Sequence, residues 1–213
     1  LIDVVIPKEN GQSKISIRGT GFIVSKDGKF ITCAHILKEL SEEERRYLGA
    51  KIPSVTDKMG ITSYQRYSIE LLKMDEENDM ALMQILSDGK KDFSVVSKLG
   101  HSASLKEGDK VIFSGYPLGL ELAMLGFGIT MTSNQCIVGS IKRRGIDGSL
   151  HFFIIDTQAN RGASGSPVFL EDTGEVVGIV SGKISQNIQL PDGKVAEIPA
   201  NMGLCRPIQY AQD

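Results

Sequence analysis

The chain has 213 residues, of which 24 are Lys or Arg and 26 are Asp or Glu, and its formal net charge is −2. A balance this close to neutral leaves no broad basic face, which argues against nucleic acid as a partner. The sequence also has no apolar run approaching the roughly 18 residues that a membrane-spanning helix requires. We therefore expect neither nucleic-acid binding nor a membrane span.

The predicted elements are mostly short strands rich in Val, Ile and Phe, separated by turns that contain Gly or Asp. In chain order, strands are expected over residues 15–25, 30–32, 63–74, 80–86, 110–115, 129–141, 150–157, 167–170, 175–184 and 201–208. One short surface helix is predicted over 41–48, where Ser41 and Glu44 form a capping-box pattern. A polar connector near residue 100 separates two groups of strands. This all-β pattern favours two small barrels, one in residues 1–98 and one in residues 99–213, which include the connector.

The three cysteines are Cys33, Cys136 and Cys205. Their odd number and wide spacing fit neither a disulfide framework nor a CxxC metal motif. A free cysteine outside such motifs generally behaves as a small buried apolar side chain. We expect this for all three, and we expect no metal ion or organic cofactor.

The segment Gly162-Ala163-Ser164-Gly165-Ser166-Pro167 is suited to a nucleophilic serine. Small residues on both sides of Ser164 allow a tight turn and the close approach of a substrate. Glycine can adopt backbone conformations that aim its N–H inward, so an oxyanion hole is predicted on Gly162, Ala163 and Ser164, with the first and last of these as N–H donors. Gly- and Ser-rich turns before strands are common, so this segment alone does not identify Ser164 as a nucleophile.

The candidate general base is one of three histidines. His101 lies in the polar connector and His151 opens a strand, and both positions are typical of exposed or structural histidines. His35 follows a predicted strand and leads into a helical turn. A candidate carboxylate partner for His35 lies further along the chain. We therefore expect His35, of the three histidines, to act in catalysis.

That partner is Asp79, which directly precedes an apolar strand. A carboxylate in this position can be drawn inward, where it holds one imidazole nitrogen and stabilises the cation that forms on the ring. The acids at positions 75–77 are expected to be exposed turn charges. The chain order His35, Asp79, Ser164 is the order of the chymotrypsin triad.

Several segments, in the same order along the chain, resemble the trypsin superfamily of serine proteases and most of all its HtrA-like branch. They are 19–28, Ile31-Thr32-Cys33-Ala34-His35, Asp79-Met80-Ala81-Leu82-Met83, 99–119, Ile155-Asp156-Thr157 with the serine motif, 174–181 and 201–208. The similarity covers roughly residues 15–208. It implies two six-stranded antiparallel barrels with the active site in the cleft between them, and a serine endopeptidase that cleaves polypeptides through an acyl-enzyme on Ser164.

The resemblance also implies a substrate pocket. Gln158 is expected at its floor, Ser181 and Gly182 along one wall, and Lys183 near its mouth. Because Gln158 is neutral, we expect the pocket to take uncharged substrate residues. The segment 174–181 resembles the strand that pairs with the substrate backbone.

Three residues depart from the family's pattern. Ser166 stands where the family usually has Gly, and Arg161 where HtrA-like enzymes usually have Pro. Ala163 replaces the Asp of members that mature by N-terminal cleavage, so no such cleavage is expected. The first two departures keep an alternative open: a catalytically weak relative that binds peptide strands as a sensor or scaffold.

Residues 118–129 are unusually apolar for a loop. HtrA-like enzymes carry a regulatory loop in the corresponding region, so one expectation is a partner-contacting segment that gates activity. The other is a loop tucked against the second barrel. The chain starts at Leu1 without Met and shows no signal peptide, so we expect a fragment or a processed form and assign no compartment. The PDZ domain that often follows in HtrA-like proteins is not expected within this sequence.

Overall fold

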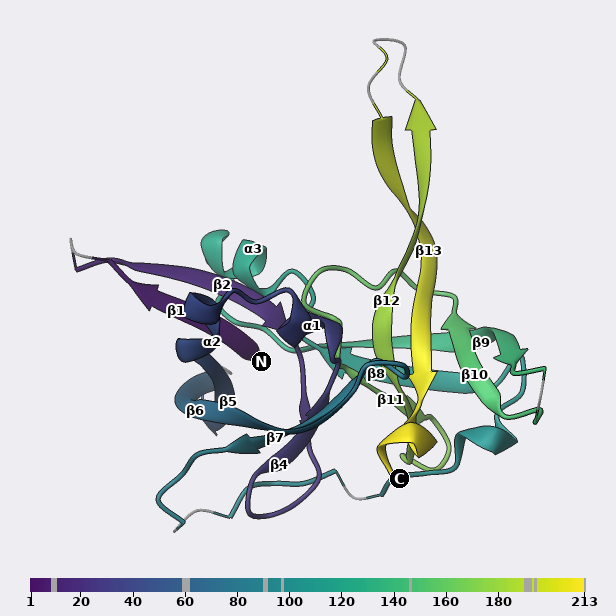
Figure 1. Cartoon of the computed structure of the whole chain (residues 1–213), viewed down its shortest axis with the longest axis horizontal. Coiled ribbons are helices and arrows are strands. Elements are labelled where there is room, and N and C mark those ends of the chain that lie inside the picture. The colour runs from purple at the N-terminus through teal and green to yellow at the C-terminus, as the bar shows by residue number, and fades with distance from the viewer. Residues whose placement is uncertain are drawn as a thin grey trace.

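The computed structural model describes residues 1–8, 11–58, 62–89, 92–96, 98–145, 147–189, 193 and 195–212. Most of its regular structure is β (Figure 1). The helices are short: α1 (His35–Lys38), α2 (Glu42–Arg46) and α3 (Gly119–Met124), with 3-10 turns at Ser102–Ser104 and Ile208–Ala211. Across the described ranges, no helix has the length and apolar character needed to cross a membrane.

Seven strands of the N-terminal part form one sheet with the order β2-β1-β5-β6-β7-β4-β3. They are β1 (Ile2–Pro7), β2 (Ser13–Gly19), β3 (Phe22–Ile23), β4 (Lys29–Thr32), β5 (Leu48–Thr56), β6 (Thr62–Asp75) and β7 (Met80–Ile85). β2 and β3 lie at opposite ends of this order, yet only Thr20 and Gly21 separate them in the chain. The two ends of the sheet therefore come close together at these residues.

The break between β2 and β3 corrects the prediction of one continuous strand over 15–25. The Thr20 N–H donates to the carbonyl oxygen of Ser164 at 2.8 Å. The Thr20 carbonyl accepts from the Thr32 hydroxyl at 2.7 Å. Because these backbone groups bond outside the β2 ladder, the strand ends and the chain turns. The N-terminal sheet accordingly has seven strands where six were predicted, and its closure into a barrel stays a prediction.

The C-terminal strands form a closed barrel with the order β10-β13-β12-β11-β8-β9. They are β8 (Lys110–Gly115), β9 (Thr132–Arg143), β10 (Leu150–Ile155), β11 (Pro167–Leu170), β12 (Val176–Gln189) and β13 (Val195–Pro207). The predicted six-stranded C-terminal barrel is thereby confirmed. β12 and β13 are longer than predicted, and their far ends form a hairpin that stands clear of the body of the molecule (Figure 1).

The local patterns located some elements and missed others. The capping box at Ser41 and Glu44 is present and starts α2. β1 and β5 were not predicted, in part because β1 contains Asp3, a residue that is rare in strands. Asp3 is fully buried and accepts a hydrogen bond from Arg66 Nε at 2.8 Å. This pairing compensates for burying the carboxylate.

Two cores follow the two sheets. The larger cluster includes Phe30, Met83 and Ile85 from the N-terminal strands, and the other includes Phe113 and Phe153 from the barrel. Three residues of the C-terminal part, Val176, Ile179 and Ile208, also belong to the first cluster. The chain thus packs both halves against each other, and the boundary between residues 98 and 99 stays a prediction.

Candidate active site

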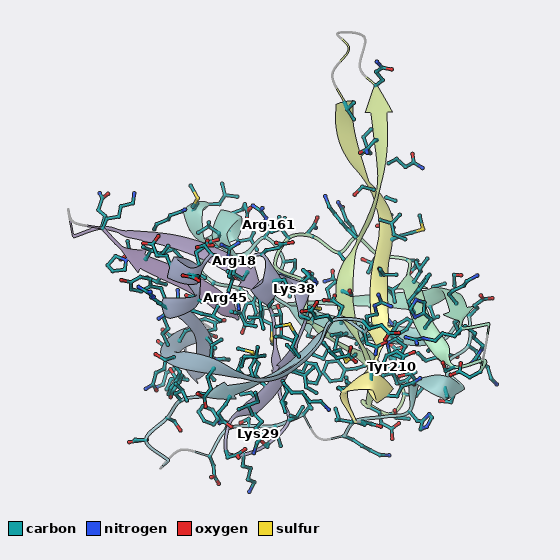
Figure 2. The ribbon with its side chains drawn as sticks, viewed as in Figure 1. Arg18, Lys29, Lys38, Arg45, Arg161 and Tyr210 are labelled. Carbon is teal, nitrogen blue, oxygen red and sulfur yellow. The ribbon has the colours of Figure 1, made fainter. Side chains whose placement is uncertain are left out.

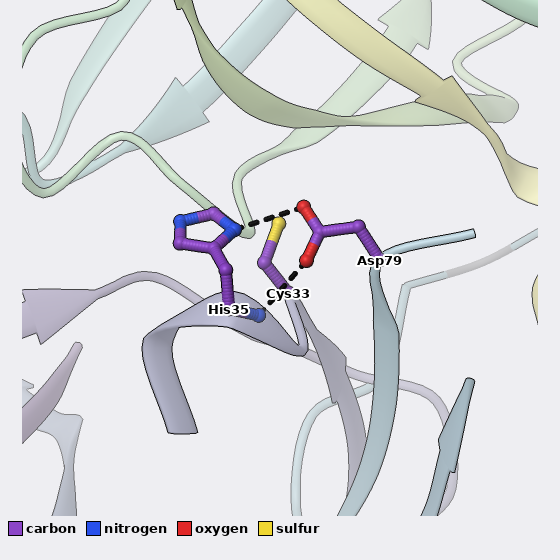
Figure 3. A group of neighbouring side chains, drawn as sticks. All are labelled: Cys33, His35 and Asp79. Carbon is purple, nitrogen blue, oxygen red and sulfur yellow. Dashed lines mark hydrogen bonds and ion pairs between the residues drawn. The ribbon is translucent and has the colours of Figure 1, made fainter. Parts of the chain in front are cut away.

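His35 lies at the start of α1, just after β4. Its backbone N–H donates to Asp79 Oδ1 at 2.8 Å, and its ring Nδ1 lies 2.8 Å from Asp79 Oδ2 (Figure 3). Both oxygens of one carboxylate therefore hold one histidine, by its backbone and by its ring. This arrangement orients the imidazole so that Nε2 faces away from Asp79.

A strained turn presents the Asp79 carboxylate. Asp79 has φ +56°, a left-handed conformation that non-glycine residues rarely adopt. The turn is stabilised by Asp75, which accepts hydrogen bonds from the Asn78 N–H at 3.0 Å and from its side-chain amide at 2.7 Å. Asp75 was predicted to be an exposed turn charge, and it is instead a half-buried residue that shapes the turn before Asp79.

The same turn is tied to the C-terminal half by Arg144. Its guanidinium donates to Asn78 Oδ1 at 2.9 Å and to Glu77 Oε1 at 3.0 Å. It also lies over the ring of Tyr210, which belongs to the C-terminal 3-10 turn (Figure 2), at 5.4 Å from the ring centroid. A strand-end arginine beyond β9 thus contacts the segment that carries Asp79.

Ser181 supplies a further hydrogen bond to Asp79. Its hydroxyl donates to Asp79 Oδ2. Burial disfavours the charged carboxylate, but the hydrogen bonds from His35 and Ser181 outweigh this effect and hold the pKa of Asp79 below its ordinary value of 3.8. Ser181 was expected as a pocket wall, and the structure joins its hydroxyl to the Asp79 carboxylate.

Ser164 completes the group from the C-terminal half. Its Oγ lies 3.2 Å from His35 Nε2, at the outer limit of hydrogen-bond reach for a nucleophile and its base. The residue is half-buried and lies in the loop before β11. The structure therefore brings His35, Asp79 and Ser164 together as a connected chain of side chains.

The backbone around Ser164 is held by Thr20. Besides the bond to the Ser164 carbonyl, Thr20 donates its hydroxyl to the Gly162 carbonyl at 2.8 Å and accepts from the Tyr116 N–H at 3.1 Å. Thr20 is buried, with 3% of its surface exposed. Thr20 lies in the resembling segment 19–28, but no pattern in the sequence points to its contacts with the serine loop.

The backbone conformation of Gly162, in the predicted oxyanion hole, leaves no room for a side chain. Its φ is +93°, and a side chain there would come within 2.4 Å of the Tyr116 carbonyl oxygen, so only glycine fits. Ala163 is fully buried, and its N–H donates to the Asn160 carbonyl at 2.9 Å. In the described part of the chain, the N–H groups of Gly162 and Ser164 have no protein acceptor. These two donors are free for a ligand oxygen.

Two of the three departures from the family's pattern, Ser166 and Arg161, flank the segment of Gly162 to Ser164. Ser166 is fully buried, and its Oγ has no hydrogen-bond partner among the described residues. It packs against Gly115, where an added Cβ would lie 1.9 Å from that oxygen. Arg161 is exposed near α3 (Figure 2), and its carbonyl accepts from the Leu118 N–H at 2.7 Å.

The remaining predicted pocket residues come from two segments. Gln158 and Gly182 are half-buried, and Lys183 is exposed. Lys183 pairs with Gly203 of β13, where an added Cβ would lie 3.1 Å from the carbonyl oxygen of Thr157, the neighbour of Gln158. The two segments are thus adjacent, and their role as a substrate pocket stays a prediction.

Cys33, His35 and Asp79 place potential metal ligands within 4.8 Å of one another (Figure 3). Cys33 Sγ is fully buried and donates to the Val180 carbonyl at 3.3 Å. Burial raises the pKa of this thiol well above its ordinary value, so the thiolate that a metal requires is disfavoured. The group is therefore poorly suited to a metal. All three cysteines are buried and free, as predicted.

In a comparison with known proteins, the family model of the trypsin-like peptidase domain matches residues 19–179. Magnetosome formation protease MamE of Paramagnetospirillum magneticum is 34% identical over 84% of this chain and 21% of that protein. A probable periplasmic serine endoprotease, DegP-like, of Chlamydia pneumoniae is 31% identical over 84% of this chain and 31% of its own length. Serine protease HTRA1 of Xenopus laevis is 30% identical over 85% of this chain and 35% of its own length.

Among solved structures, an HtrA-type protease, AlgW, described with a decapeptide, shares the fold. The TM-score is 0.64 at 20% identity, over 94% of this chain and 51% of that one. The chain spans only a fifth to about a third of the relatives named above. The similarity thus concerns one part of longer proteins.

Proposed function

The chain belongs to the trypsin-like peptidase family, in its HtrA-like branch, and we propose that it is a serine endopeptidase with His35, Asp79 and Ser164 as its catalytic triad. One observation carries this proposal. The His35 ring lies between a carboxylate at 2.8 Å and a serine hydroxyl at 3.2 Å, with one nitrogen toward each. That is the arrangement in which a histidine can take a proton from serine while its own cation is stabilised.

The chemistry follows from these contacts. His35 Nε2 accepts the Ser164 hydroxyl proton as Oγ forms a bond to the carbon of a peptide carbonyl. The tetrahedral intermediate then expels the amine, which takes the proton from His35, and leaves an acyl-enzyme. Water, activated by His35, attacks the ester carbon and frees Ser164. Asp79 remains a carboxylate throughout, which agrees with its lowered pKa.

The charge on the carbonyl oxygen would be stabilised by the free N–H groups of Gly162 and Ser164. Such donors act because they already point at the site where charge develops. Thr20 supports this role, since its bonds to the Gly162 and Ser164 carbonyls orient the peptide groups at both ends of Ala163. Thr20 is therefore a positioning residue in this proposal.

The substrate would be a polypeptide in the cleft between two barrels. His35 and Asp79 come from the N-terminal sheet, and Ser164 from the loop before β11. The near meeting of β2 and β3 at Thr20 and Gly21 supports closure of that sheet into a first barrel. The decapeptide described with the AlgW structure supports a peptide ligand. The neutral Gln158 favours uncharged residues in a pocket that Gly182 and Lys183 also line.

The apolar segment 118–129 is a candidate regulatory surface. It contains α3, and its side chains Met124, Leu125 and Phe127 are 81%, 72% and 70% exposed. At its start, Leu118 bonds to the Arg161 carbonyl in the serine loop. An apolar partner on this surface would therefore contact a segment that is hydrogen-bonded directly to the loop that carries Ser164. The exposure favours the regulatory prediction over a loop packed into the barrel.

The test is covalent labelling of Ser164 by a fluorophosphonate, together with hydrolysis of a long peptide. We expect stoichiometric labelling that disappears in Ser164→Ala and in His35→Ala, and peptide cleavage that is lost in the same variants. An intact, folded chain that binds extended peptide but is not labelled would favour the alternative, a peptide-binding sensor or scaffold. Labelling that persists in Ser164→Ala would refute the proposed nucleophile.

A further inference from the structure

The turn between β6 and β7 that carries Asp79 is closed by the pairing of Asp75 with Met80. Asp79 is the last residue of the turn, and its left-handed φ of +56° persists in a folded chain only where neighbouring contacts hold it. Its carbonyl oxygen accepts the Ala34 N–H at 3.3 Å, which fixes the end of the turn against the segment before His35. The conformation of Asp79 also depends on what holds the residue before it.

Asn78 directly precedes Asp79 and is held from two sides. Its backbone N–H and its side-chain amide both donate to Asp75, at 3.0 and 2.7 Å. The amide oxygen Oδ1 is left for another partner, and it accepts from Arg144 Nη2 at 2.9 Å. With both ends of the amide bonded, the Asn78 side chain cannot rotate without breaking a hydrogen bond. Arg144 therefore restrains the residue that joins directly to Asp79.

Arg144 is itself fixed by the C-terminal half of the chain. It follows the end of β9, where its N–H donates to the Ser149 carbonyl at 2.8 Å and its carbonyl accepts the Gly148 N–H at 3.1 Å. Its guanidinium lies over the Tyr210 ring, an arrangement in which the cation is attracted by the aromatic face. The Tyr210 hydroxyl donates to the Leu150 carbonyl at 2.7 Å, which holds the ring in place. Arg144 thus reaches the turn from a fixed base.

The two terminal nitrogens of Arg144 orient its guanidinium. Nη1 donates to Glu77 Oε1 at 3.0 Å and Nη2 donates to Asn78, whereas Nε is buried and has no hydrogen-bond partner within the described part of the chain. A buried donor left unpaired costs stability, so the Nη contacts must compensate for it. The Glu77 side chain is 74% exposed, and ion pairs with carboxylates so exposed contribute little. The partly buried bond to Asn78 is therefore the more important of the two.

The C-terminal half contacts the Asp79 segment at two points. Ser181 bonds to the Asp79 carboxylate, and Arg144 bonds to the preceding residue. The first contact fixes the group that faces His35, and the second fixes the turn from which this group projects. Because Ser164 belongs to the same half as Arg144, the second contact also restrains the turn relative to the candidate nucleophile.

We propose that Arg144 is a positioning residue for the reaction, which acts through Asn78 on the turn that presents Asp79. Holding this turn keeps the Asp79 carboxylate on the His35 ring. This inference rests on the proposed function, because it assumes that Asp79 acts in catalysis. A small displacement of a catalytic group costs much of the rate, so loss of the Arg144 side chain should lower kcat about tenfold and leave KM nearly unchanged.

Kinetics on a long peptide are the first test. Arg144→Met keeps an apolar stem near the Tyr210 ring but removes both donors, and it should show the fall in kcat. Glu77→Gln is the matched control, because it removes the exposed ion pair and leaves the bond to Asn78, and it should keep the original kcat. Arg144→Lys lacks the planar pair of donors and should also lower kcat, so it carries the test if Arg144→Met does not fold. An unchanged kcat in both Arg144 variants would overturn the proposal.

A double-mutant cycle tests the route through Asn78. Asn78→Ala removes the acceptor and should lower kcat at least as much as Arg144→Met. If Arg144 acts through Asn78, the double variant should lose no more than Asn78→Ala alone. Losses that multiply would mean that Arg144 acts by another route, and the proposal would be wrong. It would also be wrong if every loss only followed a smaller fraction of folded chain in urea unfolding.

The geometry can also be measured without catalysis. A proton held between His35 Nδ1 and the Asp79 carboxylate gives a far-downfield NMR resonance, which is lost when the contact loosens and the proton exchanges with water. In the Ser164→Ala background, Arg144→Met should broaden or remove this resonance, and Glu77→Gln should retain it. If the original chain cleaved no peptide, the endopeptidase proposal would fail, while this spectrum would still test Arg144. A resonance that Arg144→Met leaves unchanged would overturn the positioning role.

Discussion

The two sides of the candidate active site are held by different kinds of interaction. On the N-terminal side, hydrogen bonds to side chains hold the catalytic group: the Asp79 carboxylate bonds to His35 and Ser181, in a turn stabilised by Asp75 and Asn78. On the C-terminal side, hydrogen bonds to the backbone hold the serine loop: Thr20 donates to the carbonyl oxygens of Gly162 and Ser164. Charged side chains suit the residue that must stabilise a cation, whereas a rigid backbone suits N–H groups that must point at one place.

The largest effect is expected from Asp79→Asn. An amide in place of the carboxylate favours the wrong tautomer of His35 and cannot stabilise its cation, so kcat should fall on the order of 10⁴-fold. Glu76→Gln is the matched control, because Glu76 is exposed and pairs with Lys38 on the surface at 2.7 Å. Steady-state kinetics on a long peptide give kcat for both variants. A fall in kcat of less than about tenfold in Asp79→Asn would show that catalysis does not need the Asp79 carboxylate.

Thr20→Val tests the backbone side. Valine keeps the shape but removes the donor to the Gly162 carbonyl and the acceptor of the Tyr116 N–H, so the oxyanion donors should shift and kcat should fall about 10- to 100-fold. KM should change little, and Thr20→Ser, which keeps the hydroxyl, should restore most of kcat. If both variants lost activity only in proportion to a lower Tm, Thr20 would have a structural role alone.

Lowering the pH into the acid range should reduce the contribution that the Asp79 carboxylate makes to the stability of the folded chain. The pKa of Asp79 is lower in the folded chain than its ordinary value of 3.8, so its contribution to stability is fully present above that value. It is lost as the pH falls through the lowered folded value. Urea unfolding of the original chain and of Asp79→Asn should differ by a constant amount near neutral pH, and the difference should narrow in acid. A difference that did not change with pH would contradict the lowered pKa.

The smallest effect is expected from Ser166→Ala. Its buried hydroxyl has no partner among the described residues, so removing it should raise stability by about 1 kcal/mol. For a chain of this size, that corresponds to a rise in Tm of about 2–4 °C. Kinetics on peptides should not change, because the hydroxyl packs behind the serine loop against Gly115. A fall in kcat would show instead that Ser166 supports the loop.

The resemblance along the chain located the residues that meet in the candidate site, but not the contacts that support them. His35, Asp79 and Ser164 were found because each lies in a short segment with its own pattern. Ser181 was expected in a pocket wall, Asp75 was expected to be exposed, and Thr20 was not singled out. Ser181 acts on Asp79, 102 positions away, and Thr20 on Gly162 and Ser164, 142 and 144 positions away. The role of Asp75 depends on the conformation of one turn, and no local pattern reports any of these contacts.

The sequence by itself determined where many strands and turns lie, because periodicity, capping and turn composition act within a few residues. It also determined the order of the three candidate catalytic residues and the buried state of the cysteines. Only the tertiary structure decided that Thr20 breaks a strand to bind the serine loop, that Asp79 is shared by His35 and Ser181, and that β12 continues past β11 in a hairpin with β13. Each of these depends on where hydrogen-bonding groups of distant segments find partners, and that is settled only when the sheets are assembled.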